Sequence, residues 1–196
     1  MCGIWGYVGI RRPNPDLLAA AALGAARRGP HAFGWTNGLT GRSGAGTLEL
    51  EDLQGAVGGH LLGHCRLATI GATDLSAVQP IKHPHGHHLA HNGNAYNWAD
   101  LDPGAVSDSA ALASVYARHR KDGLAPDRAL QYTVLNARHN AWAIAVLDAD
   151  GTLTATRYRL PLFTLTVRSD VYLSSVRFHP DAIPLAENTY FVTGAR

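Results

Sequence analysis

The order of hydrophobic patterns along the chain restricts its fold more than any other feature of the sequence. Short or alternating apolar segments typical of strands occupy both ends, and helix-like patterns lie between them. Helices with start signals such as Asn-Pro, Ser-Asp and Pro are expected at residues 15–28, 107–121 and 126–137. Strands are expected at residues 2–8, 33–36, 47–50, 61–69, 87–91, 141–147, 152–158, 162–167, 171–175 and 189–193. Two sheets covered by helices, an α+β architecture, would satisfy this order.

Composition favours one well-packed domain. The 196 residues are 46% hydrophobic and 16% charged, and no low-complexity linker divides them, so a single domain over residues 1–196 is expected. Intrinsic disorder, which combines low hydrophobicity with high net charge, is excluded. The formal net charge is only +2, and no run of five or more like charges occurs. The sequence therefore does not indicate a protein that binds a nucleic-acid backbone.

The sequence shows no signal for a membrane or for export. No apolar run reaches the roughly 18 residues that a membrane span needs. The first basic residues, Arg11 and Arg12, follow the apolar start instead of preceding it, which is the wrong order for a signal peptide. Two cysteines, Cys2 and Cys65, do not form a disulfide framework. We therefore expect a reduced, cytoplasmic protein.

Cys2 directly follows the initiator Met1. Removal of a methionine before a small residue would leave a cysteine with a free α-amine, whose pKa is ordinarily about 7.7–8.0. Such an amine can accept the thiol proton, so an N-terminal cysteine is a nucleophile with its own base. The alternative is a small buried residue at the start of a strand, and other residues must decide between the two.

Short motifs farther along the chain support the nucleophile. They are MCGIWG at 1–6, RGP at 28–30, GHCRLATIG at 63–71, QP at 79–80, LAHNGN at 89–94 and SDS at 107–109. In this order the chain resembles the class II glutamine amidotransferase domain, as found in amidophosphoribosyltransferase, glucosamine-6-phosphate synthase, glutamate synthase and asparagine synthetase. The resemblance is strong over residues 1–108 and weak over residues 109–196. It implies the N-terminal-nucleophile hydrolase fold, a four-layer αββα sandwich.

The resemblance implies an enzyme that hydrolyses the side-chain amide of L-glutamine. Cys2 would attack the amide carbonyl, form a γ-glutamyl thioester and release ammonia, and water would then release glutamate. Asn92 and Gly93 match the oxyanion hole, where fixed donors stabilise the developing negative charge. Without the flanking motifs, the Asn-Gly pair would indicate a hairpin turn.

Other matched residues would bind the amino-acid head of glutamine. Arg66 matches the residue that holds the α-carboxylate, for which a guanidinium is suited by its paired donors. Asp108 matches the acid that binds the α-ammonium, although a carboxylate in the first turn of a helix also has a capping role. Thr69 and Gly71 would belong to a loop over bound glutamine. Arg28 and His91 would support the nucleophile and the oxyanion strand.

The sequence departs from the family pattern at Cys65, which replaces Thr or Val, and at three further positions. Leu67 replaces the usual Trp or Tyr after the arginine, Ile70 replaces a frequent His before Gly71, and His31 replaces an acid. Leu67 and Ile70 put in doubt how the glutamine loop closes. We expect His31 to change only local packing.

A cluster of histidines requires a separate interpretation. His83, His85 and His87 would share one face of an extended strand, as metal ligands could, but Pro84 and Gly86 interrupt it. The alternative is a surface loop that leads into the oxyanion strand, and we favour it, because the resemblance implies neither a metal nor a cofactor. Cys65 faces away from Arg66 in an alternating strand and is expected to be a buried core thiol.

The main hypothesis is a glutaminase domain without its own synthetase domain. Ammonia would then pass to an acceptor synthetase or transferase on another chain, docked over the glutamine loop at residues 69–73. Two alternatives remain open. The same site could hydrolyse another γ-glutamyl compound, or the chain could be a silent module that binds glutamine or a partner as a regulator.

Overall fold

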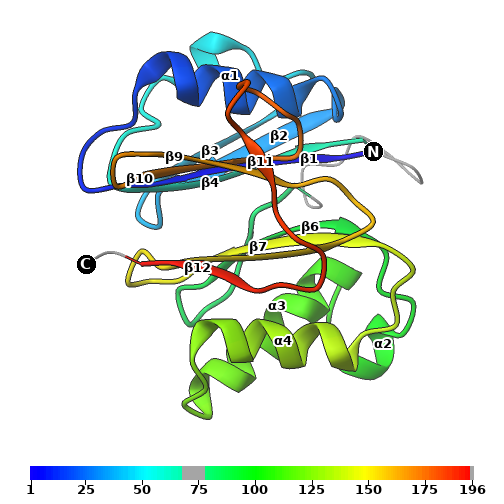
Figure 1. The fold of residues 1–196 in the computed structure, drawn as a ribbon. Helices are drawn as coiled ribbons and strands as arrows, with labels where there is room; N and C mark the ends of the chain where they lie inside the picture. Colours follow the sequence, from blue (N-terminus) through cyan, green and yellow to red (C-terminus); the bar gives the residue numbers. More distant parts are fainter. Residues whose placement is uncertain (68–77, 195–196) are drawn as a thin grey trace.

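A computed structural model of the chain describes residues 1–67 and 78–194. The structure has four layers (Figure 1). Helix α1 (Pro15–Ala26) covers a seven-stranded sheet, a five-stranded sheet lies below it, and helices α3 (Asp108–Lys121) and α4 (Pro126–Asn136) cover the outer face of that second sheet. The predicted αββα sandwich is therefore confirmed.

Both sheets are antiparallel along every described strand pair. The first sheet has the order β11 (Ile183–Pro184), β9 (Phe163–Val167), β10 (Asp170–Ser174), β1 (Gly3–Val8), β4 (His60–Arg66), β2 (Ala32–Thr36) and β3 (Gly41–Ala45). The second has the order β12 (Phe191–Thr193), β8 (Leu153–Tyr158), β7 (Trp142–Leu147), β6 (His88–Gly93) and β5 (Ile81–Lys82).

Strand β1 lies at the centre of the first sheet and is buried along its whole length. Its side chains alternate between two cores because successive residues of a strand point to opposite faces. Trp5 and Tyr7 pack under α1, whereas Ile4 and Val8 pack between the two sheets. A third core lies between the second sheet and helices α3 and α4. Covered on both faces, β1 holds the start of the chain rigidly.

The predicted helices are confirmed, with small differences at their ends. Asn14 caps α1 by accepting from the N–H groups of Asp16 and Leu17, and Ser107 caps α3 by accepting from Ala110. The first helix ends two residues earlier than expected, at Ala26. Local capping chemistry thus fixed the starts of these helices.

One predicted strand is wrong. Residues 47–50 do not form a strand; a 3-10 helix, η1 (Leu50–Leu53), begins there, and the strand that pairs with β2 is Gly41–Ala45. The backbone N–H of Glu49 donates to the Asp52 carboxylate, 3.0 Å away, and this reciprocal cap turns the chain out of an extended conformation. The expected strand at residues 61–69 ends at Arg66, and its last two residues lie outside the described ones.

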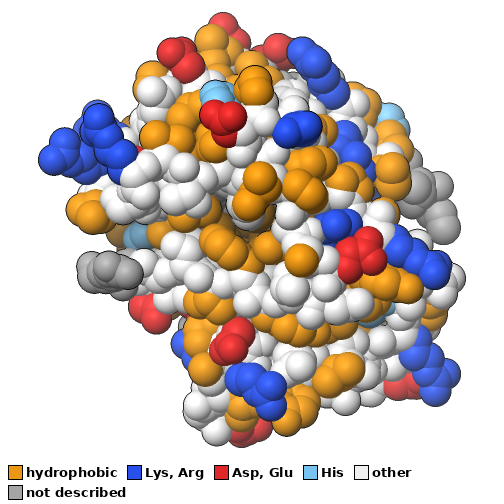
Figure 2. Space-filling view, viewed as in Figure 1, with side chains coloured by type: hydrophobic (Ala, Val, Ile, Leu, Met, Phe, Trp, Pro, Cys, Tyr) orange, Lys and Arg blue, Asp and Glu red, His pale blue; other side chains and the backbone are white. Residues whose placement is uncertain are grey.

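The sequence also missed short elements, among them β5, β11 and helix α2 (Trp98–Leu101). Among the described residues, no helix combines the length and the apolar character needed to cross a membrane. On the face of the molecule in Figure 2, Lys and Arg side chains are scattered among acidic ones and do not gather into a patch. This distribution agrees with the small net charge.

Candidate active site

Cys2 lies immediately before β1, and its backbone is held from two sides. The Cys2 carbonyl accepts hydrogen bonds from Nε of Arg28 and from Nδ2 of Asn92, each at 3.0 Å. Its sulfur accepts from the backbone N–H of Leu67 at 3.3 Å. The half-buried thiol is thereby fixed between the two sheets, with Arg28 and Leu67 on the side of the first sheet and Asn92 on that of the second.

A glycine after the cysteine makes this position possible. Gly3 pairs with Cys65 of β4 while the end of α1 passes directly above it. A Cβ atom at Gly3 would collide with the backbone carbonyl of Ala25. Gly3 therefore allows the end of α1 to pack closely against the start of β1, next to Cys2.

Asn92 and Gly93 are the last two residues of β6 and pair with Ala143 and Trp142 of β7. Thus they do not form a hairpin turn. The Asn92 side chain is only 3% exposed. Its Nδ2 donates to the Cys2 carbonyl and lies 3.4 Å from Oγ of Ser175, whereas its Oδ1 lies 3.1 Å from Nε2 of His64. The amide NH2 is consequently turned toward the cysteine.

Gly93 requires glycine for two reasons. Its φ is +135°, in a region that other residues rarely adopt. A Cβ atom would also lie 2.6 Å from the carbonyl oxygen of Ala141 and 2.9 Å from Nε2 of His91. The backbone of Gly93 therefore lies too close to Ala141 and His91 for a side chain, and it does so in the same pocket as Cys2.

Cys2, Asn92 and Gly93 line one cavity of about 260 Å³, which we call the nucleophile pocket. Its wall also contains Leu67 and, on the far side, Tyr96, Asn140 and Leu160. Tyr96 and Asn140 are linked, because the Asn140 amide donates to the Tyr96 hydroxyl at 3.1 Å. The pocket thus combines the Cys2 thiol, the Asn92 amide oriented toward Cys2, and a partly apolar wall.

Arg66 and Asp108 flank this pocket without lining it. Arg66 ends β4, directly before Leu67, which does line it, and its backbone carbonyl accepts from His31 at 3.0 Å. Asp108 begins α3, and its carboxylate accepts from the backbone N–H groups of Ala95 and Ser109 at 3.1 and 2.7 Å. Their proposed contacts with substrate remain predictions.

His91 connects Asp108 to the oxyanion strand. Its Nδ1 lies 3.2 Å from Oγ of Ser109 and 3.7 Å from the Asp108 carboxylate, and its backbone N–H donates to Oε1 of Gln79 at 2.6 Å. Nε2 of Gln79 in turn donates to Ser109 at 3.0 Å. Burial lowers the pKa of His91 below its ordinary value, so this histidine is neutral near pH 7.

Arg28 and Cys65 have the surroundings of supporting and structural residues. Burial lowers the pKa of the Arg28 guanidinium, and the neighbouring Cys2 partly offsets this shift. Cys65 is fully buried in the core beneath α1, as expected from its facing, and burial raises the pKa of its thiol to about 12. Cys65 is therefore a protonated core residue at neutral pH.

Some sequence predictions fall outside the described residues, and the histidine cluster lies on a turn in which the His87 ring contacts the Asp148 carboxylate at 2.7 Å. Thr69, Ile70 and Gly71 lie in the segment 68–77, which the structure does not describe. The histidines at 83, 85 and 87 lie on a tight turn, closed by a hydrogen bond of 2.8 Å from the His83 N–H to the His87 carbonyl. Within residues 1–67 and 78–194, no group of three or more His, Cys, Asp or Glu side chains could hold a metal ion.

The sequence analysis missed the buried partners of Asn92, which are His64 and Ser175. The alternation of β4 does place His64 on the face of Arg66, toward the second sheet, so a polar contact across the sheets was available as a signal. Nothing in the sequence pointed to Ser175, which lies 83 positions from Asn92.

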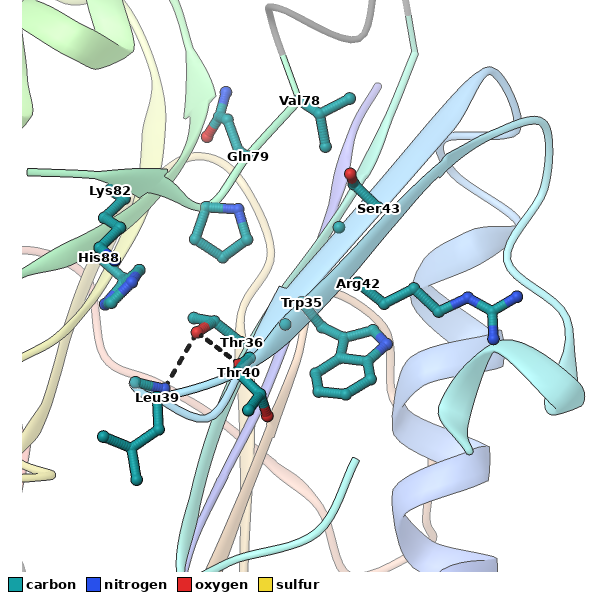
Figure 3. Close-up of a pocket in the computed structure, with 14 residues that line it drawn as sticks. Trp35, Thr36, Leu39, Thr40, Arg42, Ser43, Val78, Gln79, Lys82 and His88 are labelled. Atoms are coloured by element: carbon teal, nitrogen blue, oxygen red, sulfur yellow. Dashed lines mark hydrogen bonds between the residues drawn. The ribbon is translucent and has the colours of Figure 1, made fainter. Parts of the chain in front are cut away.

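A second hollow lies at the edge of the sandwich, and we call it the edge hollow (Figure 3). Its volume is about 300 Å³. Lys82 and His88 of the second sheet face Thr36, Leu39 and Thr40 near the β2–β3 turn, as Figure 3 shows. Arg42 points away from it and pairs with Asp52 at 2.7 Å.

The fold and the nucleophile pocket define a class of protein. The four-layer αββα sandwich matches the N-terminal-nucleophile hydrolase fold, and a cysteine at the start of its central strand faces an Asn-Gly pair from the second sheet. Within that class, the comparisons with known proteins confirm the resemblance to the class II glutamine amidotransferase domain.

The chain is 29% identical over 142 residues to amidophosphoribosyltransferase of Escherichia coli, a match that covers 60% of this chain and 27% of that enzyme. Its fold matches the glutamine phosphoribosylpyrophosphate amidotransferase of B. subtilis, solved with ADP and GMP, at a TM-score of 0.71 and 19% identity. A structure described as the allosteric regulatory enzyme of purine biosynthesis matches at 0.71 and 20%. Each structural match covers 98% of this chain and 49% of the solved chain. No protein-family model matches the sequence.

Proposed function

We propose that the chain hydrolyses the side-chain amide of L-glutamine to glutamate and ammonia. The observation that carries the proposal is the meeting of Cys2, Asn92 and Gly93 in one pocket, with the Asn92 amide NH2 turned toward the cysteine. The related sequence is an amidophosphoribosyltransferase and one solved neighbour is a glutamine phosphoribosylpyrophosphate amidotransferase, which supports the same reaction class.

The reaction begins with a free N-terminus at Cys2. Removal of Met1, whose side chain is 63% exposed, gives Cys2 an α-amine that accepts the thiol proton. The thiolate attacks the amide carbonyl, and the tetrahedral oxyanion accepts hydrogen bonds from Nδ2 of Asn92 and the N–H of Gly93. The C–N bond then breaks as the amine proton passes to the leaving nitrogen, which departs as ammonia. Water hydrolyses the γ-glutamyl thioester and restores the thiol.

Arg28 and Asn92 prepare Cys2 for this step. Both donate to the Cys2 carbonyl, and together they fix the backbone that carries the amine and the thiol. Arg28 is a positioning residue in this scheme, and His91 supports Asn92 from the preceding position of β6. Positioning of this kind lowers the entropy cost of reaching the transition state.

The glutamine head would be bound beside the pocket. Arg66 directly precedes the lining residue Leu67 and would pair with the α-carboxylate. Asp108 lies 3.7 Å from His91 and would accept the α-ammonium. Thr69 would add a contact from the loop over the substrate. Paired charges at both ends of the head would select a free amino acid over a peptide.

We further propose that ammonia passes to an acceptor synthetase or transferase chain. These residues match 49% of each of the two solved chains, so the other half of those chains has no counterpart among them. Docking near the glutamine loop would favour its closed state and raise activity. Steady-state glutamate release should rise several-fold when the partner and its acceptor substrate are added. High activity in isolation that no partner changes would indicate a simple amidohydrolase.

The nucleophile is tested by mass spectrometry and a glutamate-release assay. The mature protein should lack Met1, and diazo-oxo-norleucine, a glutamine-like electrophile, should add one adduct at Cys2. Cys2→Ala should abolish both adduct and turnover, whereas Cys65→Ala, a change at a buried core thiol, should keep both. Labelling at Cys65, or turnover by Cys2→Ala, would reject the proposal.

A further inference from the structure

His64 is a fully buried polar residue for which the reaction scheme above has no use. It lies on β4, between the two sheets, and its Nε2 lies 3.1 Å from Oδ1 of Asn92. His64 belongs to the first sheet and Asn92 to the second, so the contact joins the two layers beside the cysteine. A buried polar side chain needs a hydrogen-bond partner, and that of His64 comes from the other sheet. The role of this contact therefore needs an explanation.

The amide of Asn92 can be oriented in two ways, and only one serves the reaction. With Nδ2 toward Cys2, the amide presents donors to an oxyanion; after a half-turn it would present an acceptor oxygen there instead. The Cys2 carbonyl and Oγ of Ser175 both face Nδ2, at 3.0 and 3.4 Å. Ser175 is itself fixed, because its Oγ also accepts from the backbone N–H of Ile4 at 2.9 Å.

The other polar atom of the amide, Oδ1, is a hydrogen-bond acceptor. Nε2 of His64, which lies beside it, must therefore carry a hydrogen and donate it. Its Nδ1 is buried and has no hydrogen-bond partner among the described residues, which fits the unprotonated nitrogen of that tautomer. Burial lowers the pKa of His64 to about 3, so the ring is neutral at pH 7. The charges of Arg66 and His91 also disfavour protonation of this ring, while its hydrogen bonds with the Asn92 side chain and the His91 backbone favour it.

We propose that His64, in its neutral Nε2–H tautomer, is a positioning residue that locks the Asn92 amide with its NH2 toward the nucleophile. Ser175 assists from the other side of the amide. The inference rests on the proposed function for its catalytic consequence, but its structural content, the tautomer and the amide orientation, does not.

The kinetic test compares two substitutions. Gln at position 64 places an amide donor near the position of Nε2, whereas Leu removes the donor at similar volume. His64→Leu should lower kcat for glutamate release by about 10²–10³, the usual effect of losing one oxyanion donor, with KM for glutamine changed less than threefold. His64→Gln should recover at least a tenth of the wild-type kcat. His60→Leu, at the other end of β4, is the matched control.

A further readout separates positioning from general damage. Cys2 of His64→Leu should react with iodoacetamide, which needs no oxyanion hole, at the wild-type rate. Equal kcat in His64→Leu and wild type, or loss of alkylation together with kcat, would overturn the inference. Failure of the proposed function looks different, because wild-type protein would then release no glutamate at all.

The tautomer provides a test that needs no activity. In protein labelled with ¹⁵N at histidine, long-range ¹⁵N–¹H correlation spectra should show His64 as Nε2–H and neutral from pH 8 to pH 5. An Nδ1–H ring, or a charged ring at pH 7, would overturn the inference even if the protein had no glutaminase activity.

Discussion

The nucleophile pocket and the edge hollow are of similar size, about 260 and 300 Å³, yet they are built differently. In the edge hollow, the Thr36 hydroxyl donates to the Thr40 carbonyl and accepts from the N–H of Gly38, so this hydroxyl is engaged within its own turn. In the nucleophile pocket, Asn92 is held by buried partners and turned toward Cys2. Aimed donors, and not volume, therefore distinguish a candidate active site.

The largest effect is expected at Gly93. Gly93→Ala should lower glutamate release by at least about 10²-fold and cost about 1–3 kcal/mol of unfolding free energy, because φ is +135° and the added Cβ would meet the Ala141 carbonyl at 2.6 Å. Activity assays and urea denaturation would measure both effects. Gly104→Ala is the control, since the nearest atom to its Cβ would be 3.6 Å away. Full activity of Gly93→Ala would remove this glycine from the site.

The flanking charges should show where the nucleophile pocket extends. Arg66→Ala and Asp108→Ala should each raise KM for glutamine by about 30-fold or more, with smaller changes in kcat, because a charge contact in a closed site contributes about 2–4 kcal/mol. Steady-state kinetics tests this, with Arg128→Ala on the outer surface of α4 as control. An unchanged KM in both variants would mean that neither residue binds the substrate.

Protonation of the buried histidines should weaken the fold as pH falls. Burial holds the pKa of His64 and of His91 below the unfolded value of about 6.5, so the unfolded chain binds more protons in that range. Unfolding free energy should therefore decrease from pH 6.5 to pH 4, by up to about 1.4 kcal/mol per pH unit for each histidine. Urea titrations should show the slope, and His64→Gln should reduce it. A flat profile from pH 7 to pH 5 would contradict the lowered pKa values.

The smallest effect is expected in the edge hollow. Lys82→Ala should change kcat and KM for glutamine by less than twofold, because Lys82 lies outside the nucleophile pocket. A tenfold loss of kcat/KM would show instead that the edge hollow and the nucleophile pocket act together.

The sequence predicted best where neighbouring residues alone determine structure. Caps fixed the starts of α1 and α3, and the alternation of β4 correctly predicted that Cys65 faces away from Arg66, into the core beneath α1. Prediction failed for Gly41–Ala45. This edge strand pairs only with β2, and its side chains are mostly exposed, so it has no hydrophobic pattern. Periodicity carries no information about such a strand.

The candidate site divides in the same way. The motifs identified Cys2, Asn92 and Gly93, which the fold brings into one pocket. They did not reveal the contacts that orient Asn92, since Ser175 reaches it only after β1 and β10 have paired and the two sheets have packed. Long-range contacts of this kind depend on the topology, which local patterns do not encode.

Gln79 adds a geometric consequence. Its amide joins the backbone of His91, next to the oxyanion pair, to Ser109, next to Asp108, through bonds of 2.6 and 3.0 Å. Gln79 thus sets the spacing between two parts of the proposed site. One is the oxyanion pair, expected at the substrate amide, and the other is Asp108, expected at the substrate ammonium. Any change in the length of this side chain would therefore alter how the oxyanion strand sits against the start of α3.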